Sequence, residues 1–368
     1  PGWWWCWDHG EANLYTLHAS LRDESGRVDS KHSQTFGFRS VELQRSPDRF
    51  VYILNGREIY LRGISYLPDI YLSRCNEDQI ARDMLFVRDA GLNLVRLHVH
   101  VSPPAVYEWC DRNGILVWQD FELNWLHEHT PEFEVRARRL QAEMIDLLDH
   151  HPSVITWACH NEPTMVYMKR RNLEQHPDPA LYCDAMTQDP TRPVFICSGQ
   201  MDDDWERSGD SHPYYGAIWS KRYTDVYTHR YKLVTEFGVE TPAAVETLRQ
   251  SPEVWDRLGH LAESLDMLWN YQSELAKFHI EHFRRIRSEA NAGYIYFWLN
   301  DLVPQVGCGV LDSSRRPKGG YAAVKQASAP LQIALEHDGR RAYALWIFND
   351  TVQAYESAVI VWNVYAAH

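Results

Sequence analysis

The chain has 368 residues, of which 45% are hydrophobic, and a formal net charge of −13. This hydrophobic content is ample for a large core, so we do not expect an intrinsically disordered chain. The negative charge, with no block rich in lysine and arginine to offset it, argues against a nucleic-acid partner. No apolar run approaches the roughly 20 residues that cross a bilayer, so we expect no membrane partner.

The seven cysteines are scattered and never form a C-x-x-C pair, which favours free thiols over a disulfide framework. Because the sequence begins with Pro1, we expect the natural N-terminus to lie upstream. Cytoplasmic and exported locations are therefore equally open, and so is assembly into a homo-oligomer.

Residues 1–45 predict a partial β-sandwich. Alternating patterns over Asn13–Leu21 and Gln34–Leu43 indicate strands, and a polar turn lies between them. A second hairpin is expected around Asn55-Gly56, where the chain enters the next region.

From residue 46 to residue 330, helical patterns alternate with short β-branched runs, which is typical of βα units around a parallel sheet. Predicted strands include Asn93–Leu97, Ile115–Trp118, Val154–Cys159 and Tyr231–Thr235. We therefore predict an α/β fold, a (β/α)₈ TIM barrel. Residues 331–368 return to a strand pattern, including Ala358–Tyr365, and predict the start of a C-terminal β-sandwich.

Two glutamates follow apolar runs of the predicted barrel. Glu162 lies just beyond Val154–Cys159, and Glu236 follows Leu233-Val234-Thr235. Strand ends of a barrel converge on one rim. A retaining glycosidase needs two carboxyl groups about 5 to 5.5 Å apart. We therefore predict Glu162 as the acid/base and Glu236 as the nucleophile.

Two further residues, Arg96 and Asn161, are candidates for supporting this pair together with His212, and Asp120 is a candidate for selecting the sugar. Arg96 lies inside an apolar strand, where it would keep a nearby nucleophilic carboxylate ionised. Asn161 precedes Glu162, and its amide suits a sugar 2-hydroxyl. Asp120 follows the strand Ile115–Trp118 and is a candidate for binding two sugar hydroxyls, although a helix N-cap is an alternative.

The remaining candidates for substrate binding also follow predicted strands. His212 and Tyr214 lie in Ser211-His212-Pro213-Tyr214-Tyr215, upstream of Glu236. Trp298, whose indole could stack on a pyranose, and Asp301 end the last strand of the barrel. His98 completes the set, and core packing is the alternative for each aromatic side chain.

A metal-dependent hydrolase is an alternative class, because His98 and His100 alternate on one strand face. The rest of a ligand set is missing from the motifs, since His212 and Asp301 would have to be recruited. We therefore predict no metal and no cofactor.

Several motifs resemble glycoside hydrolase family 2. Phe36-Gly37-Phe38-Arg39 is similar to the end of the family's immunoglobulin-like domain, and Leu61-Arg62-Gly63 to its barrel entry. Asp111–Trp118, His151–Ile155 and Asn161-Glu162 follow in family order. The resemblance implies a TIM barrel flanked by partial immunoglobulin-like segments, with Glu162 as acid/base and Glu236 as nucleophile.

Within the family, Trp118–Phe121, Trp298–Asp301 and residues 316–325 are similar to β-mannosidase-type members. The Asn-x-Lys signature of β-glucuronidases has no match between Val306 and Asp312, whereas His98-Val99-His100 is closer to the galactosidase and glucuronidase pattern. We expect a retaining, β-mannosidase-like glycosidase that acts on a glycoside or oligosaccharide. A β-galactosidase-like enzyme and a non-catalytic carbohydrate-binding barrel are the alternatives.

Overall fold

The structure is a computed structural model that describes residues 2–163, 177–199, 203–219, 221–357, 359 and 361. Its body is an eight-stranded parallel sheet with the strand order β10-β9-β8-β7-β6-β14-β12-β11. The strands are β6 (Leu61–Tyr66), β7 (Leu94–Leu97), β8 (Leu116–Asp120), β9 (Val154–Ala158), β10 (Val194–Phe195), β11 (Asp210–Ser211), β12 (Leu233–Val234) and β14 (Gly293–Tyr296).

Hydrogen bonds next to β10 and β11 join the two ends of this sheet. The Ile196 N–H donates to the Arg207 carbonyl at 3.0 Å, and the Ser208 hydroxyl donates to the Cys197 carbonyl at 2.8 Å. The sheet is thereby closed, and the predicted (β/α)₈ barrel is confirmed.

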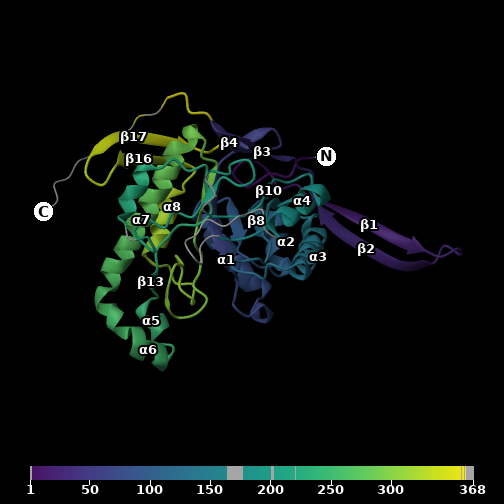
Figure 1. Cartoon of the computed structure of the whole chain (residues 1–368), viewed down its shortest axis with the longest axis horizontal. Helices are drawn as coiled ribbons and strands as arrows, with labels where there is room; N and C mark the ends of the chain where they lie inside the picture. The colour runs from purple at the N-terminus through teal and green to yellow at the C-terminus, as the bar shows by residue number, and fades with distance from the viewer. Residues whose placement is uncertain are drawn as a thin grey trace.

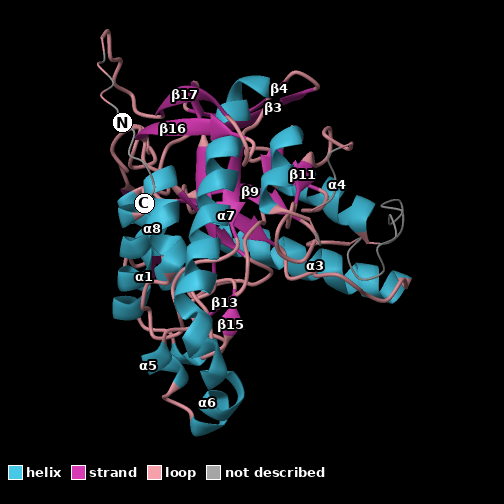
Figure 2. Ribbon diagram, turned by 90° about the vertical axis from the view of Figure 1, so that its left-hand side faces the viewer, coloured by secondary structure: helices cyan, strands magenta, loops and turns pink. Residues whose placement is uncertain are grey.

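Helices surround the strands in Figures 1 and 2. The main ones are α1 (Glu77–Asp89), α2 (Pro104–Asn113), α3 (Pro131–Leu148), α4 (Asp178–Gln188), α7 (Leu265–Arg285) and α8 (Gly319–Ala327), with the short α5 (Val245–Leu248) and α6 (Pro252–Leu258) near the base of α7. Local sequence sets several ends. The Asn76 side chain accepts a hydrogen bond from the Gln79 N–H and caps α1, while Gly114 ends α2 at φ +66°.

Smaller antiparallel sheets flank the barrel. The hairpin of β1 (Tyr15–Arg22) and β2 (Val28–Phe36) projects from the body (Figure 1), and β3 (Val41–Ser46), β4 (Arg49–Leu54) and β5 (Arg57–Ile59) form a second sheet. Near the C-terminus, β16 (Leu331–His337) pairs with β17 (Ala342–Asn349), and two-residue strands β13 (Thr241–Pro242) and β15 (Val306–Gly307) pair beside the barrel.

These sheets lie where partial sandwich segments are expected, and the boundaries 1–45, 46–330 and 331–368 stay predictions. Most of the predicted strand Ala358–Tyr365 lies outside the described residues. Within the described ranges, no helix combines the length and the apolar composition that crossing a bilayer requires.

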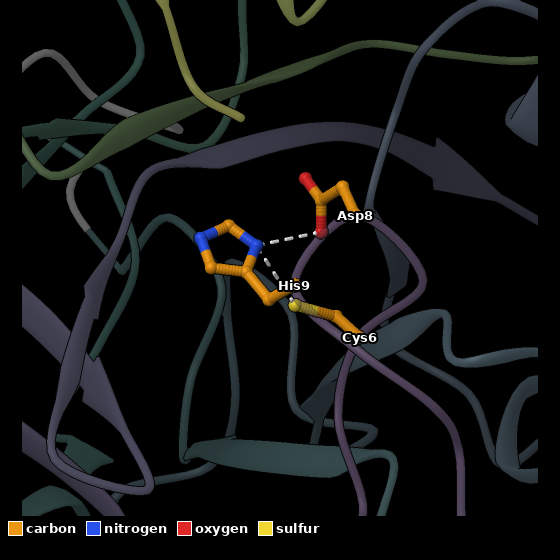
Figure 3. A group of neighbouring side chains, drawn as sticks. All are labelled: Cys6, Asp8 and His9. Atoms are coloured by element: carbon orange, nitrogen blue, oxygen red, sulfur yellow. Dashed lines mark hydrogen bonds and ion pairs between the residues drawn. The ribbon is translucent and has the colours of Figure 1, made fainter. Parts of the chain in front are cut away.

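The N-terminal segment covers the barrel at the N-terminal ends of its strands. Trp4 and Cys6 are fully buried in a cluster with Leu61, Leu94 and Leu116. Next to them, Asp8 accepts a hydrogen bond from His9 at 2.9 Å (Figure 3). A Cβ on Gly114 would lie 2.7 Å from the backbone nitrogen of Trp7, so the tight approach of this segment requires glycine there.

At the same end of the barrel, Arg62 binds two segments that lie near opposite ends of the described chain. Its guanidinium is fully buried and pairs with Asp8 at 2.6 Å and with Asp350, which follows β17, at 3.0 Å. A buried guanidinium is tolerated only when it is paired, so the two carboxylates and the arginine require one another.

We expect Arg62→Met to destabilise the protein by about 3–5 kcal/mol. The change removes the buried cation that pairs with Asp8 and one of the cations that pair with Asp350. Urea titration measures this free energy of unfolding. The control is Arg49→Met, which breaks a pair with Glu58 that is half exposed on both sides and should cost less than about 1 kcal/mol. Equal losses in the two variants would contradict the role of Arg62.

Candidate active site

A cavity of about 350 Å³ opens at the C-terminal ends of the barrel strands. Its lining comes from the segments that follow β7, β8, β9, β11, β12 and β14: His98, Asn124, Trp125, Asn161, Glu162, Tyr214, Ile218, Glu236 and Phe297. This rim is where TIM-barrel enzymes carry their active sites.

Glu162 and Glu236 face each other in this cavity. Both side chains are buried, and each has a carboxylate oxygen within 4.8 Å of the other and of a His212 ring nitrogen. The two predicted glutamates are therefore brought together from strands four and seven of the barrel.

Glu236 is held by two strong donors. Arg96 donates to Oε1 at 2.8 Å, and the Tyr214 hydroxyl donates to Oε2 at 2.8 Å. The His98 ring nitrogen Nδ1 lies 3.6 Å from Oε1. Because Arg96 never titrates in the physiological range, Glu236 has a permanent positive partner.

Glu162 has different neighbours. His212 Nδ1 lies 2.6 Å from Oε1, and the Trp125 indole donates to Oε2 at 2.9 Å. The backbone of Glu162 adopts φ +47°, a conformation that costs energy for a residue with a Cβ and that recurs at functional sites. The surroundings therefore fix both oxygens of this carboxylate.

His212 and Glu162 form a buried ion pair. Burial raises the pKa of Glu162, but the hydrogen bond and the charge of His212 outweigh it and lower this pKa to about 2. Burial alone would lower the pKa of His212, but the charge of Glu236 and hydrogen bonds with Asp210 and Glu162 raise it to about 10. At neutral pH, the shared proton resides on the imidazole.

Arg96 lies beneath the cavity, fully buried. It donates to Asp120 at 2.9 Å and to the Asn161 side-chain oxygen at 2.6 Å, besides Glu236. Burial raises the pKa of the Asp120 carboxyl, but the charge of Arg96 outweighs it and lowers this pKa to about 2. Asp120 also accepts from the Trp118 indole at 2.8 Å, so it binds protein donors below the cavity lining.

Two other predicted sugar contacts lie outside the cavity lining. Trp298 stacks on Phe297 with ring centroids 4.9 Å apart, and Phe297 lines the cavity. Asp301 is fully buried and pairs with Lys318 at 2.9 Å. By contrast, His98, Asn161 and Tyr214 line the cavity as candidates for substrate contact, and His212 lies directly behind Glu162.

His100 does not join a metal-ligand set with His98 among the described residues. Its ring nitrogens lie 2.6 Å from the Ser102 hydroxyl and 3.0 Å from the His98 carbonyl. The groups of potential metal ligands found in the described ranges contain neither histidine. The metal-hydrolase alternative therefore gains no support from this pair.

Sequence reasoning missed four residues of the lining, namely Asn124, Trp125, Ile218 and Phe297. Trp125 is the most consequential, because it binds Glu162 from the loop between β8 and α3. The one signal in the sequence is that this tryptophan follows the strand-end residue Asp120 by five positions. Nothing in the sequence indicates the backbone conformation of Trp125, φ +56°, in the structure.

A family model for glycosyl hydrolases family 2, TIM barrel domain, matches residues 48–333. The chain belongs to glycosyl hydrolase family 2. The matched range contains every residue of the cavity lining. The family assignment expected from the sequence motifs is thereby confirmed.

Relatives of this family 2 member include a β-mannosidase from Capra hircus, 30% identical over 169 residues that cover 43% of this chain and 19% of that protein. An exo-β-D-glucosaminidase from Amycolatopsis orientalis is 24% identical over 425 aligned positions, which cover 99% of this chain and 40% of that protein. The chain therefore spans less than half the length of these curated relatives.

Among solved structures, a β-D-mannosidase from Dictyoglomus thermophilum superposes with a TM-score of 0.84 at 24% identity, and the match covers 96% of this chain and 49% of that chain. At this level of identity, the likeness shows the shared fold.

The His212–Glu162 pair predicts a pH-dependent stability. The raised pKa of His212 contributes stability that is complete below about pH 6.5 and is lost as the pH rises through about 10. The lowered pKa of Glu162 contributes stability that is present above about pH 4.5 and is lost as the pH falls through about 2.

We therefore expect the free energy of unfolding of the unmodified protein to exceed that of His212→Gln most between about pH 4.5 and 6.5. The difference should shrink as the pH rises toward 10. Urea titrations of both proteins across this range measure it. A difference that does not change with pH would show that His212 acts without its charge.

Proposed function

We propose that the protein is a retaining β-glycosidase that works by double displacement. The observation that carries this proposal is the pair of buried carboxylates, Glu162 and Glu236, with oxygens within 4.8 Å of each other in one cavity. A short separation suits retention, since an inverting enzyme needs room for a water between its carboxyl groups. Membership of family 2 supports the same reaction class.

In the first step, Glu236 attacks the anomeric carbon while the bond to the leaving oxygen breaks. Glu162 donates a proton to that oxygen, so the alcohol leaves neutral and a glycosyl ester remains on Glu236. The hydrogen bonds from Arg96 and Tyr214 orient the attacking carboxylate.

The proton for this step is stored on His212. Because the imidazole carries it at neutral pH, and because Nδ1 lies 2.6 Å from Glu162, a short transfer along this hydrogen bond makes Glu162 the acid. The proton moves only a short distance, and the transfer needs no access to solvent, because His212 is fully buried beside Glu162.

In the second step, Glu162 is again a carboxylate and takes a proton from water, whose oxygen attacks the anomeric carbon. The ester bond breaks, and Glu236 leaves as a carboxylate that Arg96 and Tyr214 bind again. No cofactor is needed for either step.

We propose a β-mannoside as the substrate, because β-mannosidases occur among the relatives in both sequence and structure comparisons. A β-galactoside is the second candidate. It is favoured by His98, which lines the cavity 3.6 Å from Glu236 and belongs to the stretch His98-Val99-His100 that resembles the galactosidase and glucuronidase pattern. A panel of nitrophenyl β-glycosides ranks the two by kcat/KM.

We expect Glu236→Gln to lower kcat on the best aryl glycoside by on the order of 10⁴- to 10⁶-fold, because the amide has no charge with which to attack. The control is Glu240→Gln, the same change at an exposed position four residues later, which should retain activity. A 2-fluoro glycoside should label Glu236 in the unmodified protein. Near-normal turnover by Glu236→Gln would overturn the assignment.

Glu162→Ala separates the acid/base from the nucleophile. For a substrate with a poor leaving group, we expect the rate of the first step to fall by about 10²- to 10⁴-fold, because the departing oxygen has lost its proton donor. A dinitrophenyl glycoside, whose leaving group needs no proton, should form the glycosyl ester at a nearly normal rate. Burst kinetics compare the two substrates, and equal losses on both would contradict the role of Glu162.

A further inference from the structure

Two histidines and a carboxylate lie together outside the cavity lining. Ligand atoms of His127, His160 and Asp178 are within 4.8 Å of one another. His160 follows β9 two residues before Glu162, Asp178 is the first residue of α4, and His127 belongs to the loop between β8 and α3. His160 and Asp178 are buried, while His127 is partly exposed and gives access from solvent.

Backbone carbonyl groups fix the orientation of both imidazoles. His127 Nδ1 lies 2.8 Å from the Glu128 carbonyl oxygen, and His160 Nε2 lies 3.1 Å from the Trp125 carbonyl oxygen. A carbonyl can only accept, so each of these nitrogens carries a hydrogen. The opposite nitrogens, Nε2 of His127 and Nδ1 of His160, are then the atoms suited to bind a cation.

This arrangement is the one that metal-binding histidines usually show. A ligating histidine almost always donates its second N–H to a carbonyl or carboxylate, which fixes the tautomer and the ring orientation. On the other side of His160, Nδ1 already lies 2.8 Å from the Asp178 carboxylate. Two imidazole nitrogens and one carboxylate oxygen, with water in a fourth position, are a ligand set typical of zinc.

We propose that His127, His160 and Asp178 bind one divalent cation of the zinc class. The metal would lie between His160 Nδ1 and the Asp178 carboxylate, and coordination would take the place of the contact that these two groups now make. The proposal concerns a structural site and does not depend on the proposed glycosidase reaction.

The two other groups of potential ligands in the described residues are less suited to a separate cation site. In the group of Cys6, Asp8 and His9, one nitrogen, His9 Nδ1, lies 3.5 Å from the sulfur and 2.9 Å from the carboxylate (Figure 3). The Arg62 guanidinium binds the same carboxylate at 2.6 Å, so a cation is already present. The group of Glu162, His212 and Glu236 belongs to the candidate active site.

A metal at this position would join two segments that hold the acid/base. Trp125 lies two residues before His127, accepts from His160 through its carbonyl, and donates to Glu162 through its indole. Fastening His127 to His160 therefore fixes the loop that carries Trp125 against the end of β9. The cation would order this loop without touching the substrate.

Metal binding to the full chain, stripped with chelator and free of any histidine tag, tests the proposal. Calorimetric titration with Zn²⁺ should give one ion per chain, and His127→Ala should weaken binding by about 10- to 100-fold or more. Because protons compete with a metal for imidazole nitrogens, the affinity should fall as the pH is lowered. Cobalt(II) should give visible absorption bands of nitrogen and oxygen coordination that are lost in His127→Ala.

Two controls make the outcome specific. His18→Ala, at an exposed histidine of β1, and Glu162→Gln, in the candidate active site, should both bind zinc as the unmodified protein does. Asp178→Asn is a second ligand variant, and circular dichroism checks that each variant is folded. Absent binding, unchanged affinity in folded His127→Ala, or loss of affinity in Glu162→Gln would each overturn the proposal.

Discussion

The buried guanidinium of Arg96 is the constraint on which the candidate site depends. It lies on β7 and binds Asp120, the last residue of β8, and three side chains that follow β9, β10 and β12, namely Asn161, Ser198 and Glu236. It also donates to the Thr235 carbonyl. A fully buried cation is costly unless carboxylates and acceptors surround it. Glu236 and Asp120 are the two carboxylates that pair with this buried charge, so the proposed nucleophile is also part of the network that joins the barrel strands.

The two glutamates differ because their cationic partners differ. Glu236 accepts its hydrogen bonds from Arg96, which stays protonated at every pH of interest, and from the Tyr214 hydroxyl. Glu162 faces His212, an imidazole that can give up a proton and take it back. One carboxylate is thus suited to attack and the other to proton transfer. The assignment of roles follows from these partners, since both side chains are buried to a similar degree.

The sequence predicted the barrel and its two glutamates because apolar runs mark strands and the next residues must reach the rim. It could not predict which way side chains at strand ends point, so Asp120, Trp298 and Asp301 were expected at the sugar but contact Arg96, Phe297 and Lys318. The alternating pattern over Gln34–Leu43 predicts one strand, whereas the structure separates β2 from β3 near Gly37. A Cβ added to Gly37 would lie 2.9 Å from the side chain of Pro152. Such tertiary contacts leave no periodic signal in the sequence.

A comparison of Arg62 with Arg96 shows why position in the barrel decides what a buried ion pair does. Both arginines are fully buried on neighbouring strands, and each binds two carboxylates. The partners of Arg62, Asp8 and Asp350, come from segments that cover the N-terminal ends of the strands, and the pairing leaves nothing for a ligand to reach. The partner Glu236 of Arg96 lines a cavity at the opposite end. The same electrostatic arrangement therefore fastens the chain at one end of the barrel and, at the other, holds a charged oxygen where a substrate can approach it.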